Sequence, residues 1–325
     1  MNKITIKKIK GKEYAYLEKS IRIGAAVRKV SKYLGPNNKV TKNKIIQSEK
    51  EFDKELFNKE VNLHINKILD EINKLEYPLN KEEVKKIEEM NLKYKRIMHN
   101  LHEKDLEDLN KRFIANYVFE SNAIEGSSLT LKNVVEVVFE DRISQGKDLR
   151  EIYEAQNSYK VFLFLKSSRV KINNELIIKI HAMLMDKIDN RLGYRKVPME
   201  LLGNPLAKLS SPEEVEEDLN NLLKWFEKSE NNLYPLELAF KFHAKFEKIH
   251  PFSDGNGRVG RFLLNYILIK KGYFPIIIRK NTRNNYIKSL EAADRGKWIV
   301  LMRFALNHYK NTFRKFYEIY YQHVS

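Results

Sequence analysis

The sequence predicts an all-α protein, and three observations support that fold class. Apolar residues recur at three- and four-residue spacings in successive runs along the 325-residue chain. Segments rich in proline, glycine and asparagine separate those runs, as expected of loops between helices. Hydrophobic residues make up 42% of the chain, with 17 Phe and 17 Tyr, so it can bury a core and is not disordered.

The helical runs divide the chain into three expected regions. Residues 1–45 form a basic N-terminal segment in which Ile4, Ile6 and Ile9 fit either a short strand or a tail, and a break follows at 35–38. Residues 46–126 form a helical region with two long amphipathic helices, 46–76 and 81–110. Residues 127–325 form the core with the C-terminal helices. The shorter helices are expected at 112–125, 130–142, 148–168, 173–188, 213–228, 235–249, 256–271, 282–293 and 296–321.

Several classes of protein are excluded by what the sequence lacks. With no cysteine, there is no disulfide, zinc–thiolate site or cysteine nucleophile. Neither an HExxH metalloprotease motif nor a GxxxxGK[ST] phosphate loop is present. The first 20 residues hold no apolar run of signal-peptide length, and nothing approaches a membrane span. A cytoplasmic protein without a membrane partner is therefore expected.

The net charge of +17 is concentrated at the two ends of the chain. Residues 1–50 carry 14 basic and 3 acidic side chains, and residues 270–325 carry 12 and 3. Such ends could attract nucleic acid or an acidic protein. A lysine-rich composition accounts for the same excess without any partner, so nucleic acid is an alternative here and not the favoured partner.

The most informative segment is the twelve residues 250–261, HPFSDGNGRVGR, which lie between two helical runs. Pro251 ends the first run, because the residue before a proline is pushed out of the α region. Gly255 and Gly257 let the backbone turn its amides toward an anion without a side chain in the way. The following helix contributes free N–H groups and the positive end of its dipole. This loop is therefore a candidate phosphate site.

A dinucleotide-binding interpretation of the same loop fails on context. Residues 255–260 read G-x-G-x-x-G, but that fingerprint must follow a strand and precede an acidic residue about 20 positions on. Here a helical run and a proline precede it, and residues 276–285 contain no acidic side chain.

The side chains of the loop suit phosphate chemistry. His250 titrates near neutrality and can accept a proton from an attacking hydroxyl. A single carboxylate, Asp254, beside a phosphate cradle suits Mg²⁺. Arg258 and Arg261, together with backbone amides, can stabilise charge that develops on phosphate oxygens.

The segment resembles the signature of the Fic family, HPFx[D/E]GNGRxxR, at every specified position. The resemblance implies a Fic-type helical bundle with an N-terminal helical extension and a β-hairpin flap over the active site. It implies transfer of AMP from ATP, with Mg²⁺, to a Ser, Thr or Tyr hydroxyl of a target protein or of the enzyme itself. The implied roles are base for His250, Mg²⁺ ligand for Asp254, anion hole for Gly255, Asn256 and Gly257, phosphate support for Arg258, γ-phosphate contact for Arg261 and loop anchor for Phe252.

A second motif, at residues 121–126, bears on regulation. Ser121, Glu125 and Gly126 fit the family's inhibitory pattern [S/T]xxxE[G/N] at the end of an amphipathic helix, where Gly126 is a natural C-terminal residue. By resemblance, Glu125 pairs with Arg261 and holds ATP in an unproductive pose. In some relatives the same glutamate positions water for AMP removal, so a brake, a hydrolytic role and both together stay open.

Residues 190–212 hold two glycines and three prolines, which excludes a helix there. The resemblance places the flap hairpin here, beginning near Gly193-Tyr194-Arg195, with an extended target segment pairing along its edge.

Four alternatives remain open: AMP removal; phosphoryl, other nucleotidyl or phosphocholine transfer; use of UTP or GTP; and a regulatory binding protein that uses the basic ends. The related kinases typically carry a lysine where Gly257 stands, which favours AMP over phosphate. Self-association is also open. Outside the loop, His243 is expected to serve in packing, and Asn285 and Tyr286 lie where relatives line the adenine pocket.

Overall fold

The computed structural model describes residues 3–23, 26–71, 79–142, 146–199 and 209–324. Contacts divide the chain into two compact units: one comprises Met1–Asn73 and Val84–Glu89, and the other Lys74–Glu83 and Met90–Ser325. Each unit has its own core.

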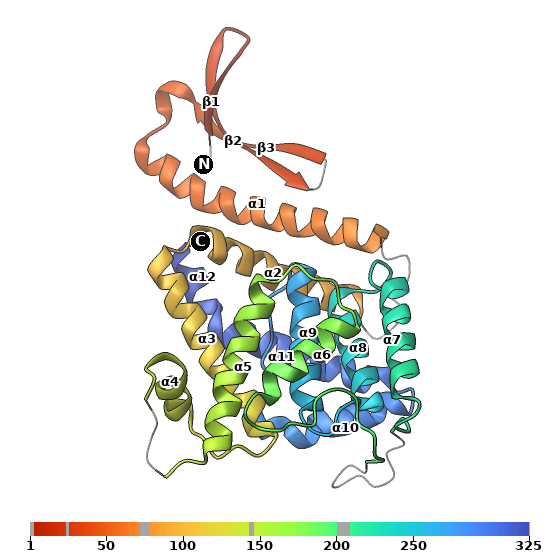
Figure 1. The fold of residues 1–325 in the computed structure, drawn as a ribbon. Helices are drawn as coiled ribbons and strands as arrows, with labels where there is room; N and C mark the ends of the chain where they lie inside the picture. Colours follow the sequence, from red (N-terminus) through yellow and green to blue (C-terminus); the bar gives the residue numbers. More distant parts are fainter. Residues whose placement is uncertain (1–2, 24–25, 72–78, 143–145, 200–208, 325) are drawn as a thin grey trace. The chain divides into compact units, whose positions relative to one another are not determined.

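The N-terminal unit is a three-stranded antiparallel sheet with a long helix (Figure 1). Its elements are β1 (Lys3–Ile9), β2 (Lys12–Ile23), β3 (Ala26–Pro36), the 3₁₀ turn η1 (Asn37–Lys39) and α1 (Lys42–Glu71). One face of the sheet is apolar, and its core residues pack together with side chains of α1. That core consists of Ala15, Leu17, Ile21, Val30, Leu34, Phe52 and Leu56.

The sheet is more extensive than the short strand or tail expected for residues 1–45. Two features of the sequence conceal it. Lysines stand at both inward and outward positions, so the period-two alternation of polar and apolar residues is blurred. In addition, the register of β2 and β3 shifts at Ala15/Tyr16, which breaks the alternation where the β-bulge lies.

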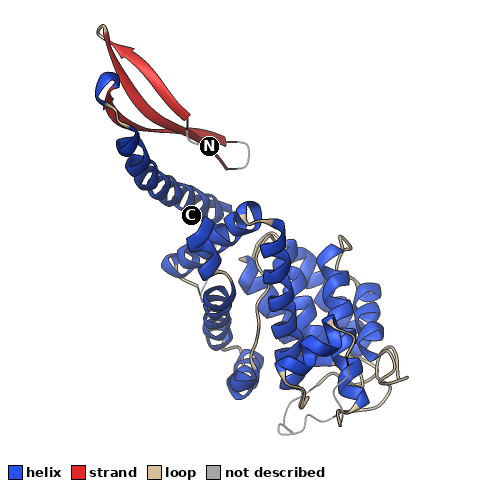
Figure 2. Ribbon diagram, turned by 90° about the vertical axis from the view of Figure 1, so that its left-hand side faces the viewer, coloured by secondary structure: helices blue, strands red, loops and turns tan. Residues whose placement is uncertain are grey.

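The prediction of a mainly helical protein is confirmed by the rest of the chain (Figure 2). The helices are α2 (Lys81–Asn100), α3 (Glu103–Ile124), α4 (Leu131–Phe139), α5 (Leu149–Ser167), α6 (Asn174–Met185), α7 (Val215–Ser229), α8 (Pro235–Ile249), α9 (Asn256–Lys270), α10 (Arg283–Asp294), α11 (Trp298–Phe316) and α12 (Glu318–Val324), with a 3₁₀ turn η2 (Lys280–Thr282).

Two helices expected as single runs are interrupted. The run 81–110 breaks between α2 and α3, where His102 adopts an extended backbone and its side chain accepts a hydrogen bond from the backbone N–H of Lys104. A side-chain acceptor at the N-cap satisfies one of the free amides and starts a new helix. The run 296–321 breaks between α11 and α12 at Tyr317.

The α8–α9 pair organises the C-terminal unit (Figure 1). Helices α3, α5 and α6 contact α9, while α7, α10 and α11 contact α8. Helix α9 is buried along most of its length, including Phe262, Leu263 and Tyr266. The loop between α8 and α9 therefore leads into a helix that is buried along most of its length, which restricts the movement of the loop.

The predicted flap lies largely outside the described residues, because positions 200–208 fall in an undescribed gap. The described flanks, 190–199 and 209–212, contain no strand. A hairpin over the site therefore stays a prediction.

Candidate active site

The turn between α8 and α9 is built by two residues in the left-handed conformation. His250 caps α8 with φ 52° and ψ 60°, and Gly255 precedes α9 with φ 80° and ψ 5°. A side chain at Gly255 would meet the methyl group of Met185 at 2.7 Å as well as incurring backbone strain. The two reversals direct the free amides at the start of α9 toward the loop, where an anion can bind.

Phe252 and Asn256 hold this loop closed. The Phe252 side chain is fully buried, and its ring stacks on His181 with centroids 3.8 Å apart. The Asn256 side chain accepts a hydrogen bond from the Phe252 amide at 2.8 Å and donates one to the Phe252 carbonyl at 2.7 Å. Phe252 thus lies where an anchor was expected. The Asn256 side chain is committed to the loop itself, which leaves phosphate contacts to backbone groups.

The imidazole of His250 has a defined tautomer. Its Nδ1 lies 3.3 Å from the carbonyl oxygen of Glu247, which can only accept a hydrogen bond, so Nδ1 carries the proton. Nε2 is then the unprotonated nitrogen. Burial lowers the pKa of His250, and the charge of Arg195 lowers it further. The ring is therefore neutral at pH 7 and able to accept a proton.

Arg195 binds the end of α8. Its guanidinium is buried and donates to the carbonyls of His250 (2.8 Å), Val197 (3.2 Å) and Ser210, while its amide donates to Pro251 at 2.8 Å. One side chain thus joins both described flanks of the predicted flap to the residues around His250. The sequence signal was the Gly193-Tyr194-Arg195 segment, but it did not indicate this role.

Asp254 lies in a cluster of charges. Its Oδ2 accepts from Arg150 at 2.5 Å, and its Oδ1 accepts from the Gly255 amide at 2.6 Å. Arg258 is buried and lies 3.6 Å from Asp254 and 3.2 Å from Glu154. Arg258, expected to contact phosphates, therefore faces two carboxylates in this structure. Arg150 and Glu154 are members of the site that the sequence did not identify.

The donors around Asp254 are compatible with Mg²⁺ bound together with a nucleotide. Among the described residues, no three His, Asp or Glu side chains gather as a metal cage. A nucleotide-bound Mg²⁺ needs only one or two carboxylates, since phosphate oxygens and water complete its shell. Asp254 is one-third exposed and can serve as that carboxylate once Arg150 moves off Oδ2.

Arg261 and the end of α3 form the clearest long-range contact of the site. Arg261 is 3% exposed, and its Nη2 donates to Glu125 Oε1 at 2.7 Å and to the Ser121 carbonyl at 2.9 Å. Its Nε donates to Ser121 Oγ at 3.0 Å. Burial alone would lower the pKa of Arg261, but the charge of Glu125 outweighs burial and raises it. This guanidinium is permanently charged, and Glu125 neutralises it.

The Glu125 carboxylate lies directly on the first turn of α9. A Cβ at Gly257 would collide with Glu125 Oε1 and would lie 2.9 Å from Arg261 Nη1. Glu125 ends α3, and Gly126 follows with φ 110°, a conformation that favours glycine. An anion is therefore already seated at the α9 N-terminus, and it comes from the protein.

Three buried polar side chains, His243, Glu247 and Tyr286, form a cluster near Arg261. His243 Nε2 lies 2.5 Å from the Tyr286 hydroxyl, and its Nδ1 lies 3.8 Å from Glu247 Oε1. Burial lowers the pKa of His243 to about 3 and raises that of Glu247 to about 8. Both side chains are thus neutral at pH 7. Tyr286, which the family resemblance associated with the adenine pocket, is 4% exposed and contacts His243.

Comparisons with known proteins agree with this geometry. Residues 171–268 match the sequence model of the Fic/DOC family. The protein adenylyltransferase fic-1 of Caenorhabditis elegans is 29% identical over 206 residues, 62% of this chain and 40% of the relative. A probable protein adenylyltransferase of Aquifex aeolicus is 32% identical over 184 residues, 55% of this chain and 54% of the relative. The chain thus spans about half or less of the length of these relatives.

Solved structures give the same result for the fold. A Fic-domain signalling protein from Bacteroides thetaiotaomicron superposes with a TM-score of 0.64 at 21% identity, covering 72% of this chain and 97% of that one. Fic-1 from C. elegans superposes with a TM-score of 0.63 at 26% identity, covering 72% and 71%. The segment that matches the Fic/DOC family model, residues 171–268, includes the α8–α9 loop and most of α9, and the fold around it is similar to that of the solved Fic structures.

Proposed function

We propose that the protein transfers AMP from ATP to a Ser, Thr or Tyr hydroxyl of a target protein, and that Glu125 restrains this activity. The observation that carries the proposal is the Glu125–Arg261 ion pair at the N-terminus of α9, beside the neutral imidazole of His250. The names of the adenylyltransferase relatives support the reaction class.

The site's own residues account for the steps of this transfer. His250 Nε2 accepts the proton of the target hydroxyl as its oxygen forms a bond to the α-phosphorus. The bond between that phosphorus and the bridging oxygen to the β-phosphate breaks, and pyrophosphate leaves with the electron pair. The product is a phosphodiester between AMP and the target. The Gly255 amide donates to Asp254 Oδ1, so the backbone amide of Gly257, in the first turn of α9, is the group proposed to stabilise the charge that builds on the phosphate.

Mg²⁺, when bound, neutralises phosphate charge, and Asp254 is the residue that would hold it. The Arg150–Asp254 contact keeps this carboxylate in place beforehand.

The proposed restraint of AMP transfer follows because Glu125 and the γ-phosphate of ATP compete for the same cation, Arg261. Arg261 is the buried guanidinium that the γ-phosphate of ATP would need, and Glu125 already occupies it. While Glu125 stays, the γ-phosphate must lie elsewhere, and the α-phosphorus is then displaced from His250. Displacement of about 1 Å is enough to cost a large part of the rate.

The deciding experiment compares the wild type, Glu125→Gly and the double variant Glu125→Gly/His250→Ala, incubated with Mg²⁺ and with ATP labelled at either the α- or the γ-phosphate. We expect α-label on the protein to rise roughly tenfold in Glu125→Gly. It should fall at least a hundredfold in Glu125→Gly/His250→Ala. Glu107→Gly, which makes the same change on an exposed turn of α3, is the matched control. Incorporation of γ-label alone would replace this proposal with a kinase.

A second candidate is removal of AMP from a modified protein, with Glu125 positioning the attacking water. Its support is that Glu125 is 38% exposed, within reach of solvent, while its charge also acts on the pKa of His250. Release of AMP from purified, modified protein by the wild type but not by Glu125→Gly would establish it.

The target segment is proposed to dock along residues 190–212, and self-modification is proposed as the simplest activity to observe. Arg195 supports this placement because it ties both flanks of that segment to the residues around His250.

A further inference from the structure

One face of the N-terminal sheet carries aromatic and cationic side chains that the proposed transfer does not use. Strand pairing places Lys7 opposite Tyr14, Tyr16 opposite Tyr33, and Ser20 opposite Lys29, all on one face. Arg22, two residues after Ser20, belongs to the same face. We call Lys7, Tyr14, Tyr16, Arg22, Lys29 and Tyr33 the tyrosine face. The opposite face holds Ala15 and Leu17 and packs with α1.

The three tyrosines form one continuous cluster. The Tyr33 ring lies 5.9 Å from the Tyr14 ring and 5.4 Å from the Tyr16 ring, tilted at 53° and 52°. Tyr33 is 53% exposed although it is a large aromatic side chain. Tyr14 and Tyr16 are half-buried. Polar side chains suffice for the solvent face of a sheet, so an exposed ring that adjoins two half-buried ones indicates a contact surface.

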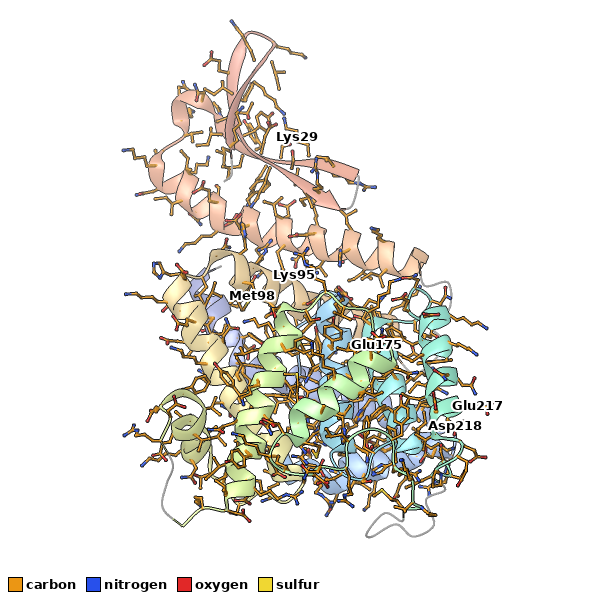
Figure 3. All side chains as sticks on the ribbon, in the orientation of Figure 1. Lys29, Lys95, Met98, Glu175, Glu217 and Asp218 are labelled. Carbon is orange, nitrogen blue, oxygen red and sulfur yellow. The ribbon has the colours of Figure 1, made fainter. Side chains whose placement is uncertain are left out.

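An acidic side chain, Glu18, lies on the same face of the sheet, but it is neutralised and does not repel a bound anion. Glu18 is 5% exposed, with Lys7 Nζ at 2.8 Å and Lys29 Nζ at 2.6 Å from its two carboxylate oxygens. These two lysines lower its pKa to about 2, so it stays ionised and paired. Lys7 and Lys29 remain 41% and 61% exposed, and Lys7 Nζ also lies 4.6 Å from the centre of the Tyr16 ring. Figure 3 labels Lys29 on β3.

The charge of the whole sheet has the same sign. Residues 3–36 contain ten basic and two acidic side chains. The following helix, residues 42–71, carries six basic and seven acidic side chains, so the excess belongs to the sheet. Positive potential is thus concentrated on the part of the unit that carries the tyrosines.

We propose that the tyrosine face binds single-stranded RNA. Flat aromatic side chains on a sheet stack on unpaired bases, and flanking cations contact the phosphates between them. An acidic protein segment would use the cations but not a cluster of rings. A duplex would hide its base faces from the rings. The exposed hydroxyls of Ser20 and Ser31 on the same face can bond the ribose 2′-OH, which favours RNA over DNA.

The test measures binding of a fluorescently labelled, uridine-rich RNA of about 15 nucleotides to the full chain without ATP, by anisotropy at about 100 mM salt. We expect Tyr33→Ala to weaken binding about tenfold, whereas Tyr33→Phe keeps the ring and stays within about twofold. Lys3 pairs with Glu18 and so lies on the same face as Arg22. Lys3→Gln/Arg22→Gln should weaken binding and flatten its salt dependence. Lys8→Gln/Lys19→Gln removes the same charge from the opposite face and should have a smaller effect.

The outcomes separate stacking from simple charge attraction. No binding by the wild type would overturn the proposal, as would equal affinity for a duplex of the same length. The proposal would also be overturned if the two double lysine and arginine variants lost the same RNA affinity while Tyr33→Ala kept full affinity. Binding would then depend on net charge alone. Tighter binding of the matching DNA strand would exclude RNA as the ligand. A folded Tyr33→Ala protein with unchanged AMP transfer would show that a loss of RNA binding is local to the sheet.

Discussion

A single buried guanidinium, Arg261, is the group on which both the proposed restraint and the proposed transfer depend. It is held by Ser121 and Glu125 from a helix 136 to 140 residues earlier in the chain. Removing an anionic partner from a buried cation leaves its charge uncompensated, which typically costs about 3–5 kcal/mol. Glu125 is therefore expected to leave only when another anion replaces it, and the γ-phosphate of ATP is an anion of that kind.

The lowered pKa of His250 predicts the pH dependence of transfer. The neutral form accepts the proton, so the rate should follow the fraction of neutral imidazole. Because burial lowers the pKa below its usual 6.5, transfer by Glu125→Gly should be constant between pH 7 and 8 and should fall only in more acidic solution. A labelling series over this range checks it, with thermal stability as the control for unfolding. A half-maximal rate above pH 7 would remove His250 as the base.

Glu247 predicts a second pH effect, this one on stability. Burial raises its pKa to about 8, whereas the unfolded chain keeps the ordinary value of 4.5. As pH rises from 4.5 to 8, the unfolded state loses this proton first, so the group makes the folded state progressively less stable. Glu247→Gln should therefore exceed the wild type in unfolding free energy by about 3–4 kcal/mol more at pH 8 than at pH 5.

Urea unfolding at the two pH values tests the Glu247 prediction. Glu217→Gln, an exposed position on α7 (Figure 3), is the control and should show no pH-dependent gain. An equal gain for Glu247→Gln at both pH values would mean that Glu247 is ionised in the folded protein.

Helix termini are the elements on which the site depends. Helix α8 ends at His250, α9 begins after Gly255, and α3 ends at Glu125. Each terminus leaves backbone groups without intrahelical partners. At α8 the guanidinium of Arg195 supplies donors to such carbonyls, and at α9 the Glu125 carboxylate lies where an anion would.

Substitution of Arg195 should destabilise the folded protein at the end of α8. Arg195→Leu removes the donors to buried carbonyls and should lower the unfolding free energy by about 2–4 kcal/mol. Arg195→Lys keeps the charge but not the fork of donors, so it should recover only part of the loss. Arg191→Leu, an exposed arginine paired with Asp189, is the control and should stay within about 0.5 kcal/mol. Equal effects of Arg195→Leu and Arg191→Leu would show that the carbonyl contacts add nothing.

The whole molecule consists of two compact units with separate cores. The core of the sheet contains only residues from 15 to 56, while the buried α8–α9 pair belongs to the other unit. None of the described helices is long and apolar enough to cross a membrane.

Two units predict two unfolding transitions. Leu17→Ala removes a fully buried side chain from the sheet core. It should lower the free energy of unfolding of the N-terminal unit by about 2–4 kcal/mol. ATP should stabilise the other transition alone, because the proposed site lies in the C-terminal unit. Leu263→Ala makes the equivalent change in α9 of the C-terminal unit. It should lower the free energy of unfolding of the transition that responds to ATP. Denaturant unfolding followed by circular dichroism, with and without ATP, checks both variants. One cooperative transition shifted by both would show that the units unfold together.

The sequence by itself determined the helical class, most helix positions and the position of the candidate loop at residues 250–261. These depend on contacts within a few residues: the helical period, Pro251 at a helix end, and the glycines of the loop. The motif with the proposed inhibitory role was also visible, through the resemblance of residues 121–126 to the family pattern.

Only the tertiary structure decided which distant groups meet. The placement of Glu125 on Gly257, Arg195 on the end of α8, Arg150 on Asp254 and Glu247 behind Arg261 depends on how helices pack, and no local pattern encodes those contacts. The N-terminal sheet was likewise concealed, because lysines on both faces and a register shift obscured its alternation. Side chains far apart in sequence acquire their chemistry from burial and from neighbours, and both are properties of the packed chain.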